Sequence, residues 1–424
     1  EKGRAKQQAA ASGVAAVSMA ASDWSRLPPR PSVTTSDSTS TSVPTTSVQL
    51  AFGQTLAQEM KQLGISNVEI DKNGIVYGEI PGNTPAPAIG FLAHMDTVED
   101  YCGKNVRPVV HANYQGGDLV INAAKNMRLT PQTAPSLAKC VGDDIVTSDG
   151  NTLLGGDDKM GIALIMTLCE HLLTHPEIAH GPVKVSFTVD EETGTGVRYF
   201  DIARFGADFA YTVDGSSLGD IDCGNFNADT VEIHITGRNC HPGAAKNFML
   251  NPVRIASDIV SSWPENRLPE TTDGEEGFIL FMHMQAQLDS AVLKGIVRHH
   301  DLAQFEQFKK DLENLVDEKR AKYPGAKIEI HFTKQYRNMR QVLQEHPQAM
   351  QVLESALQEQ GIAYRLIQAR GGTDGAQLSL RGLPTPNIFA SYENPHGPYE
   401  WLSLGWSEKV FRLLLCILKN ALPK

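Results

Sequence analysis

The stretch Ala88-Ile89-Gly90-Phe91-Leu92-Ala93 runs directly into His94-Met95-Asp96-Thr97, and this step from apolar to polar residues indicates the fold. Three further apolar runs lead to ligand-type side chains: 183–189 before Asp190-Glu191-Glu192, 209–213 before Asp214, and 386–390 ahead of His396. Short apolar runs bounded by polar turns are typical of buried parallel strands. Because the site of an open α/β sheet lies beyond the carboxyl ends of its strands, these side chains are expected to converge on one crevice.

Asp157 adds another carboxylate to this set. It lies in Leu154-Gly155-Gly156-Asp157-Asp158-Lys159-Met160-Gly161, a glycine-rich turn that leads into an apolar periodic stretch ending near Leu173. Zinc is a borderline-soft cation that accepts imidazole and carboxylate ligands, and a pair of such ions sharing one carboxylate needs about this inventory. The sequence therefore predicts a dinuclear metallohydrolase.

Each of these features also has an ordinary interpretation. A histidine after a strand is more often a packing or surface residue, a Glu-Glu pair is usually solvated, and an aspartate such as Asp214 can cap a turn through its own backbone. The features occur together, in order and at strand ends, and this conjunction favours the metal site.

Several longer stretches carry a likeness to one known family: Gly103-Lys104-Asn105-Val106, Tyr114-Gln115-Gly116-Gly117-Asp118, Tyr211-Thr212-Val213-Asp214-Gly215, His241-Pro242-Gly243 and Arg370-Gly371-Gly372-Thr373-Asp374-Gly375. From about Val43 to Leu418 the chain resembles the dinuclear zinc peptidases, and within them the peptidase T (tripeptide aminopeptidase) branch. The resemblance implies two Zn²⁺ per subunit, with Co²⁺ or Mn²⁺ as alternatives. It implies these ligands: Asp157 as the bridge, His94 and Asp214 on one ion, and Glu192 and His396 on the other.

Two assignments around these ligands have their own reasons. Asp157 is preferred to Asp158 because it matches the position that the family has before its Lys-x-Gly turn. Asp96 is expected to orient His94, because a ligating histidine usually donates its other ring N–H to a carboxylate.

Glu191 is the expected general base. Adjacent residues at a strand end point in different directions, so Glu192 can bind metal while Glu191 faces the water held between the ions. Such a water has a pKa of about 7, within reach of a carboxylate. Glu191 would take its proton and then pass it to the leaving amine. The alternative is that Glu191 is an exposed acid beside a ligand.

His241 follows residues 230–237, whose alternation is typical of a half-buried antiparallel strand and indicates a change of domain. The resemblance implies that His241 reaches from a lid domain to the substrate carbonyl, where a donor would stabilise the developing oxyanion. The alternative is a turn histidine before Pro242.

The resemblance implies that Arg370 binds the C-terminal carboxylate of the substrate, and a planar guanidinium suits that group because it can bind both oxygens at once. A carboxylate anchor about 10 Å from the amine-binding end would measure three extended residues. Tyr336 and Asn338 are expected to help to close the same pocket. The alternative is that Arg370 pairs with Asp374 across the glycine turn.

The composition agrees with a large enzyme. A chain of 424 residues exceeds what one core usually supports, so two domains are expected. A net charge of −11 without a basic tract disfavours nucleic acid or an anionic membrane surface as a partner. The scattered cysteines lack Cys-x-x-Cys spacing and are expected to be reduced thiols, which indicates a cytoplasmic location. Short peptides are the expected partners, and the sequence does not indicate an oligomeric state.

The alternation of apolar strands with helical segments predicts an α/β fold, with a mostly parallel catalytic sheet that carries helices on both faces. Residues 49–224 and 338–424 are expected to form its two halves, and 225–337 an inserted α+β lid with two alternating strand patterns around two helical ones. Residues 1–48 are atypical. They are rich in alanine and then in serine and threonine, and this composition predicts disorder.

The predicted function is a zinc-dependent aminopeptidase that releases the N-terminal residue of tripeptides. A related dipeptidase or N-acyl amino acid amidohydrolase is the alternative enzyme, and N-blocked peptides would separate the two. A metal-binding relative without catalysis is the other alternative. Its mark would be loss of the base, and Glu191 is present.

Overall fold

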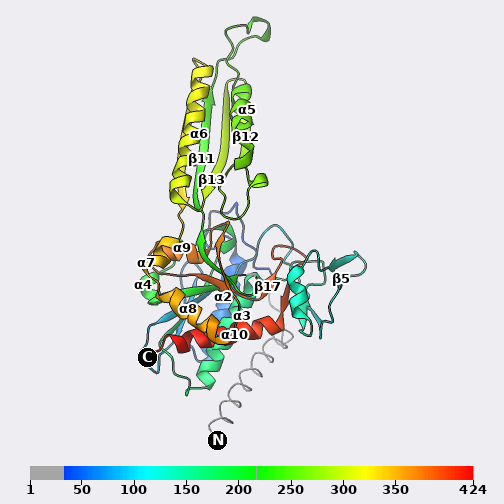
Figure 1. Cartoon of the computed structure of the whole chain (residues 1–424), viewed down its shortest axis with the longest axis vertical. Helices are drawn as coiled ribbons and strands as arrows, with labels where there is room; N and C mark the ends of the chain where they lie inside the picture. Colours follow the sequence, from blue (N-terminus) through cyan, green and yellow to red (C-terminus); the bar gives the residue numbers. More distant parts are fainter. Residues whose placement is uncertain (1–32, 216, 424) are drawn as a thin grey trace. The chain divides into compact units, whose positions relative to one another are not determined.

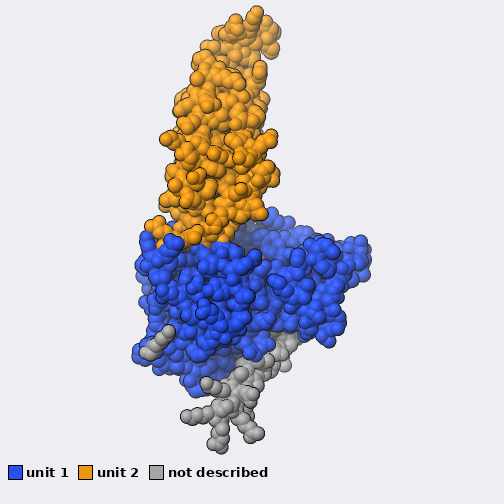
Figure 2. All heavy atoms as spheres, in the orientation of Figure 1, with its two compact units in different colours: residues 1–223, 342–367, 373–424 blue, residues 224–341, 368–372 orange. Residues whose placement is uncertain are grey.

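The computed structural model describes residues 33–215 and 217–423, which divide into two compact units (Figure 2). Unit 1 contains the described residues up to Cys223, then Val342–Ile367 and the residues from Thr373 on. Unit 2 contains Gly224–Gln341 and Gln368–Gly372. Each unit has a hydrophobic core of its own. The chain therefore passes from unit 1 into unit 2 and back twice.

Unit 1 is built on an eight-stranded mixed sheet (Figure 1). Its strands are, in order across the sheet, β1 (Ser66–Ile70), β2 (Val76–Ile80), β8 (Val183–Thr188), β3 (Ile89–His94), β9 (Phe209–Gly215), β16 (Asn387–Phe389), β10 (Asp220–Asn225) and β15 (Arg365–Ala369). The central strands β8, β3, β9 and β16 run parallel. Strand β2 pairs antiparallel with β1 and with β8, and β10 pairs antiparallel with β16. The predicted α/β fold is confirmed, with a parallel centre and antiparallel pairing toward the edges.

Helices cover both faces of this sheet. In β9 the adjacent side chains of Tyr211 and Thr212 point to opposite faces. The Tyr211 hydroxyl donates to the carbonyl of Ala349 in α8 at 2.6 Å, whereas a Cβ on Gly375 of α9 would lie 2.9 Å from Thr212 Oγ1. The helices wholly in unit 1 are α2 (Ser47–Leu63), α3 (Gly156–Thr174), α4 (Ile202–Phe205), α8 (Gln348–Gln360), α9 (Asp374–Leu380) and α10 (Leu404–Asn420), and α7 (Arg340–Glu345) begins in unit 2. No helix in the described part of the chain combines the length and apolarity that crossing a membrane requires.

Unit 1 also contains two smaller sheets that the sequence pattern did not indicate. One has the order β17 (Tyr392–Glu393), β18 (Trp401–Ser403), β7 (Ile145–Thr147) and β4 (Val109–His111), and the other pairs β5 (Leu119–Asn122) with β6 (Met127–Leu129). In the first sheet Trp401 pairs with Thr147. This pairing brings the segment that follows His396 beside the segment that precedes Asp157.

Residues 33–48, expected from their composition to be disordered, follow a defined path in unit 1. Thr34 and Ser36 are buried, and Thr35 forms a parallel β-bridge with Thr97. The hydroxyl groups and backbone of this segment bond to Thr97, Glu99 and Asp190, which follow strands β3 and β8, so the segment is held by polar contacts rather than by apolar burial. Residues 1–32, which carry the rest of that expectation, lie outside the described residues.

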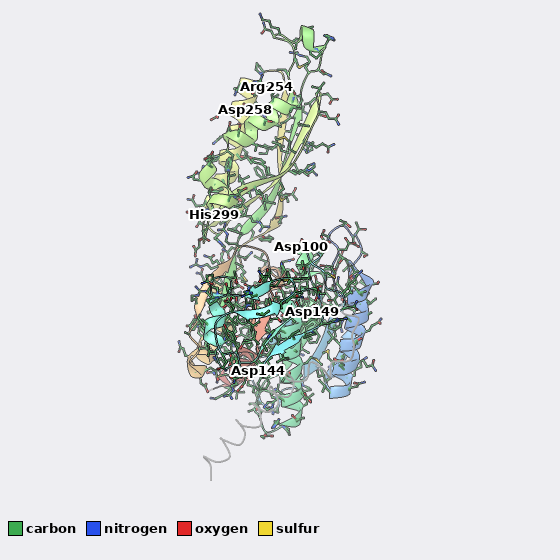
Figure 3. All side chains as sticks on the ribbon, turned by 90° about the vertical axis from the view of Figure 1, so that its right-hand side faces the viewer. Asp100, Asp144, Asp149, Arg254, Asp258 and His299 are labelled. Atoms are coloured by element: carbon green, nitrogen blue, oxygen red, sulfur yellow. The ribbon has the colours of Figure 1, made fainter. Side chains whose placement is uncertain are left out.

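Unit 2 is a four-stranded antiparallel sheet with two long helices. The strand order is β12 (Phe278–Ala286), β13 (Ser290–His299), β11 (Asn227–Thr236) and β14 (Lys327–Tyr336), and the helices are α5 (Pro252–Ser262) and α6 (Leu302–Lys322). Asp258 on α5, labelled in Figure 3, accepts bonds from Lys322 at 2.8 Å and from Tyr323 at 2.9 Å, which joins the two helical segments. The sequence indicated two strand patterns here, and the sheet has four strands.

Candidate metal centre

The carboxyl ends of β3, β8 and β9 meet at one edge of the unit 1 sheet, because these strands are adjacent and parallel. His94 is the last residue of β3, and Asp214 lies next to the end of β9. Glu191 and Glu192 begin a short helical turn, η2 (Glu191–Thr193), just after β8. Side chains that lie far apart in the sequence are therefore delivered to one place by strand geometry alone.

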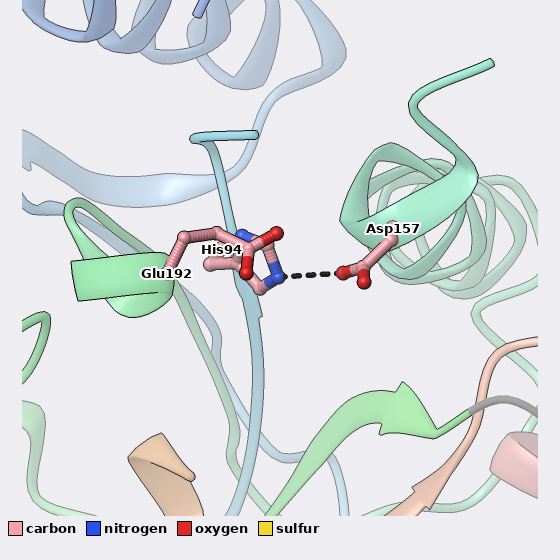
Figure 4. A group of neighbouring side chains, drawn as sticks. All are labelled: His94, Asp157 and Glu192. Atoms are coloured by element: carbon pink, nitrogen blue, oxygen red, sulfur yellow. Dashed lines mark hydrogen bonds and ion pairs between the residues drawn. The ribbon is translucent and has the colours of Figure 1, made fainter. Parts of the chain in front are cut away.

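The His94 side chain is buried and surrounded by carboxylates. Its Nε2 atom lies 2.9 Å from Asp157 Oδ1 and 3.3 Å from Asp214 Oδ1, and its Nδ1 atom lies 3.3 Å from Asp96 Oδ1. Figure 4 shows the contact with Asp157, which comes from the first turn of α3. Both ring nitrogens of His94 thus face a carboxylate.

Asp157 lies between two histidines. While its Oδ1 atom faces His94, its Oδ2 atom lies 3.1 Å from Nε2 of His396. The same nitrogen of His396 lies 3.3 Å from Glu192 Oε2. His94, Asp157 and Glu192 also offer ligand atoms that all lie within 4.8 Å of one another. One carboxylate therefore faces two separate imidazoles, each with a further carboxylate beside it.

Asp158 is the rival for the bridging position. With His94 and Asp214 it forms a second group whose ligand atoms lie within 4.8 Å of one another. Its carboxylate is fully buried and accepts the backbone N–H groups of His94 at 3.2 Å and Gly161 at 3.1 Å. The Asp158 carboxylate is therefore occupied by backbone N–H groups. Asp157, not Asp158, contacts both His94 and His396.

Asp96 has a second contact that the sequence did not indicate. Its two carboxylate oxygens accept the backbone N–H groups of Glu191 and Glu192, each at 3.1 Å. Asp96 is fully buried. It therefore holds the turn that carries both glutamates at the same time as it faces the ring of His94.

Burial acts on four carboxyl groups of the cluster in the same direction. It raises the pKa of the carboxyl groups of Asp158, Glu191, Glu192 and Asp214 above their ordinary values. For Asp158 and Glu191 the charge of Asp214 adds to this effect. Carboxylates crowd one another here, because ionising each one places another negative charge in a poorly solvated site.

The histidines respond in the opposite direction. Contacts with Asp157 and Glu192 raise the pKa of His396 to about 10. Burial lowers the pKa of His94, but the nearby carboxylates of Asp214 and Asp157 outweigh burial and hold that pKa well above its ordinary value. The cluster thus stabilises positive charge. A donor set of imidazoles and carboxylates with unbalanced negative charge fits divalent cations such as zinc.

His241 lies in unit 2, at the turn after β11. Its side chain is exposed, and its Nδ1 atom accepts the backbone N–H of Gly243 at 3.1 Å, which caps the short helical turn η3 (Pro242–Ala244). The other ring nitrogen is left for a different partner. This is the geometry of a turn histidine, and a role toward substrate stays a prediction.

Arg370 also lies in unit 2, and its guanidinium is occupied there. Its Nη1 atom donates to the carbonyls of Gly274 at 2.8 Å and Glu276 at 3.1 Å, and its Nη2 atom lies 3.2 Å from Thr272 Oγ1. The guanidinium carbon lies 5.3 Å from the centre of the Phe226 ring. These contacts hold residues 272–276, and neither a substrate carboxylate nor Asp374 is needed to explain them.

Asn338 joins backbone segments of unit 2. Its Oδ1 atom accepts from the backbone N–H groups of Asn225 at 3.1 Å and Arg340 at 2.9 Å. Its amide nitrogen donates to the carbonyl of His300 and to the side chain of Gln368, each at 3.1 Å. Every polar position of the Asn338 side chain is thus used inside the unit.

Tyr336 differs from Asn338, because its buried hydroxyl has no hydrogen-bond partner among the described residues. Arg298 lies over its ring at 5.8 Å, and burial raises the pKa of the phenol. The hydroxyl therefore remains available for a partner that the protein itself does not supply.

Two residues of the segment near His396 contact the cluster and escaped sequence reasoning. The hydroxyl of Tyr392 donates to the side chain of Asp214 at 3.0 Å. Glu400 is buried and accepts backbone N–H groups next to Asp157, and burial raises its pKa to about 7. The one available signal was a glutamate four residues after a predicted ligand, which is too common a spacing to single it out.

Asp190 is a third residue that sequence reasoning missed, and it precedes the predicted base directly. Its carboxylate accepts the backbone N–H of Thr45 at 2.9 Å and Nε2 of Gln49 at 2.6 Å. The Asp190 backbone N–H in turn donates to Gln49 Oε1 at 3.0 Å. Thr45, just before α2, and Gln49, in its first turn, therefore hold the turn that carries Glu191.

Comparison with known proteins gives relatives along most of the chain. A family model described as a peptidase dimerisation domain matches residues 223–324. Peptidase T of Caldanaerobacter subterraneus subsp. tengcongensis is 43% identical over 388 residues, which cover 91% of this chain and 95% of that protein. Peptidase T of Exiguobacterium sibiricum is 44% identical over 386 residues, with coverages of 91% and 94%.

Solved structures share the fold. The aminopeptidase PepT of Bacillus cereus has a TM-score of 0.70 at 21% identity and covers 87% of this chain and 92% of its own. A tripeptidase of Staphylococcus aureus has a TM-score of 0.68 at 20% identity, with coverages of 90% and 94%. A dinuclear metal-binding peptidase of the M20 family from Bacillus subtilis has a TM-score of 0.58 at 16% identity, with coverages of 88% and 93%.

Proposed function

The chain belongs to the peptidase T family, and we propose that it is a zinc-dependent aminopeptidase that releases the N-terminal residue of tripeptides. Family membership makes it a peptidase. The Bacillus cereus neighbour is described as an aminopeptidase and the Staphylococcus aureus neighbour as a tripeptidase, which supports the reaction and the substrate class.

One observation carries the proposal: the Asp157 carboxylate lies between His94 and His396, with 2.9 Å to one imidazole and 3.1 Å to the other. A structural ion pair needs one histidine. An oxygen directed at each of two histidines is the arrangement that a carboxylate shared by two metal ions requires.

The proposed ligands form two sets around Asp157. His94 and Asp214 would complete the set for one ion, and Glu192 and His396 the set for the other. When bound, the ions would polarise the peptide carbonyl and make a water molecule acidic enough to lose a proton near neutral pH. Zinc is proposed because it accepts imidazole and carboxylate in variable proportion.

Glu191 is the proposed general base. The bond from its backbone N–H to Asp96 fixes the start of the η2 turn, and Asp190 is fixed by Thr45 and Gln49. These contacts fix the backbone from which the Glu191 side chain projects. Glu191 would accept a proton from the attacking water and then donate it to the amine that leaves.

His241 and Arg370 are the proposed substrate-binding residues outside this cluster. The imidazole of His241 would donate to the substrate carbonyl as negative charge develops there. Arg370 would bind the C-terminal carboxylate of the peptide, for which it would have to exchange some of its bonds to the carbonyls of residues 272–276. Tyr336 is proposed to support that carboxylate through its unpaired hydroxyl.

The test uses purified protein and a panel of free and N-acetylated dipeptides, tripeptides and tetrapeptides. We expect hydrolysis of free tripeptides, a loss of that hydrolysis after chelation, and its return with added zinc, cobalt or manganese. Preferential cleavage of N-acetylated substrates would show that the protein is an amidohydrolase and not an aminopeptidase. Full activity in protein that elemental analysis shows to be metal-free would overturn the dinuclear site.

A further inference from the structure

Glu400 is a buried carboxylate that binds the backbone of the Asp157 turn. Its side chain is 1% exposed. Its Oε2 atom accepts the backbone N–H groups of Leu154 at 2.8 Å and Gly155 at 2.7 Å, and its Oε1 atom accepts the N–H of Asp157 at 2.9 Å. Three N–H groups from four successive residues therefore converge on one anionic group. Backbone concavities of this kind are built for an anion.

Two glycines make this approach available. Gly155 has φ +79°, a left-handed conformation that a side chain would strain. A Cβ on Gly156 would lie 3.1 Å from Glu400 Oε1 and 3.1 Å from the Cβ of Tyr392, so a larger residue would press on the carboxylate. The Gly-Gly pair before Asp157 thus shapes a turn around the glutamate.

The other end of Glu400 belongs to the segment that carries His396. The backbone N–H of Glu400 donates to the carbonyl of Gly397 at 3.3 Å, which closes a turn directly after the histidine. Strand β18 starts at the next residue and pairs with β7. Glu400 therefore binds the backbone of the Asp157 turn, while His396 of the same segment contacts the Asp157 side chain.

We propose that Glu400 is a positioning residue that sets the approach of Asp157 to His396 and thereby the affinity of the site for divalent cations. The inference rests on the proposed function, because it assigns both of these residues as ligands. Glu400 would not contact the metal. It holds the backbone of one ligand and shares a short turn with another.

The chemistry favours a carboxylate here over an amide of the same shape. A carboxylate accepts hydrogen bonds on both oxygens, whereas a glutamine would place an NH₂ group against at least one backbone N–H. That donor would push the Asp157 turn away from the His396 segment. Groups that orient metal ligands typically change metal affinity about 10–100-fold when they are replaced.

The experiment compares Glu400→Gln with Glu393→Gln as the matched control. Glu393 lies on the same segment, is partly buried and accepts from Ser217 Oγ at 2.9 Å, so it tests the same substitution at a carboxylate that bonds elsewhere. The readouts are the Kd for Zn²⁺ from competition with a chromophoric chelator, the bound zinc from elemental analysis, and the Tm of the metal-free proteins.

We expect Glu400→Gln to bind zinc about 10–100-fold more weakly than wild type, and Glu393→Gln to bind it as wild type does. A Glu400→Gln protein with wild-type zinc affinity and a lower Tm would overturn the proposal, because the residue would then serve stability alone. If that variant does not fold, Glu400→Asp replaces it. The shorter side chain keeps the charge but reaches fewer amides, and wild-type zinc affinity in Glu400→Asp would equally overturn the proposal.

The proposed function fails in a different way. A wild-type protein that binds zinc but cleaves no tripeptide would refute the substrate class and leave the zinc affinity of the Glu400 variants as a valid test. If the wild-type protein cleaves tripeptides and Glu400→Gln binds zinc as tightly as wild type, only the role of Glu400 is refuted.

Discussion

The predicted residues of unit 1 and those of unit 2 are in opposite situations. In unit 1 Asp157 contacts both His94 and His396, although nothing in local sequence joins the three residues. In unit 2 Arg370 and Asn338 bond to the backbone of their own unit. The first group is explained best by a ligand that all its members share. Arg370 and Asn338 already have partners, and among the predicted residues of unit 2 the hydroxyl of Tyr336 has none in the described part of the chain.

The difference shows what strand position adds to a motif. A residue at the carboxyl end of a parallel strand has a location as well as an identity, because neighbouring strands end at the same edge. For a residue in a glycine turn such as 370–375, the sequence gives the residue type but not its position relative to the site. Function assigned to it therefore depends on measurements that separate binding of substrate from support of the fold.

The largest effect should come from Glu191→Gln. The substitution keeps the volume and removes the proton acceptor, so kcat for a tripeptide should fall by about 10²–10⁴. Metal content should stay near wild type, because Glu191 is not a proposed ligand. Steady-state kinetics and elemental analysis on the same sample check this.

Asp157→Ala is the matched control in the same cluster, and it should lose metal as well as activity. Near-normal turnover in Glu191→Gln would show that the division of roles between Glu191 and Glu192 is wrong. Loss of metal in Glu191→Gln would also show that this division is wrong, because Glu191 would then act as a ligand.

An intermediate effect is expected from Arg370→Lys, and it tests the region with the weaker assignment. Lysine keeps the charge but cannot bind two carboxylate oxygens in one plane, so kcat/KM for tripeptides should fall about 10–100-fold, as loss of charge-assisted hydrogen bonds implies. Tripeptide amides lack the carboxylate, so they should be poor substrates for wild type and hardly worse for the variant.

The Tm of Arg370→Lys separates the two roles of this arginine. If tripeptides and their amides lose the same factor while the Tm falls, Arg370 acts by holding residues 272–276. Equal cleavage of tripeptides and their amides by wild type would show that Arg370 does not bind the substrate carboxylate.

No direct effect on turnover is expected from Thr45→Val, which tests whether the segment before α2 is held to Asp190. Valine keeps the backbone bond to Asp190 but removes the hydroxyl bond to the same carboxylate. Loss of a hydrogen bond to a charged group should lower the free energy of unfolding by about 1.5–3 kcal/mol. Denaturant unfolding measures this, and Thr41→Val, at an exposed position of the same segment, should have no comparable effect.

The central sheet and its cluster could be predicted because their signals are local. An apolar run that ends in a histidine or an acid is visible in a window of a few residues, and β3 and β9 fit it. Strands such as β4 and β7 have three residues each, too few for a periodic pattern. Their sheet was therefore missed.

The supporting contacts could not be predicted, because they depend on tertiary structure. Glu400 is a charged residue that sequence rules place at the surface, and only the converging N–H groups of residues 154–157 make its burial favourable. Residues 33–48 were expected to be disordered for the same reason, because composition does not show tertiary contacts. Thr34 and Ser36 are buried with hydrogen bonds to Thr97, which composition does not reveal.

The bond between Glu400 and the Asp157 turn has a consequence for the order in which the protein is made. Leu154 and Glu400 are separated by 246 positions, so the ribosome completes most of the chain before the acceptor for these N–H groups exists. Domains fold in order as they emerge, and the earlier part of unit 1 must wait in an incomplete form. A nascent chain therefore cannot assemble the proposed ligand set until synthesis has passed His396 and Glu400. On the proposed assignment, peptide cleavage would begin only after the segment from His396 to Glu400 has been synthesised and has joined the sheet.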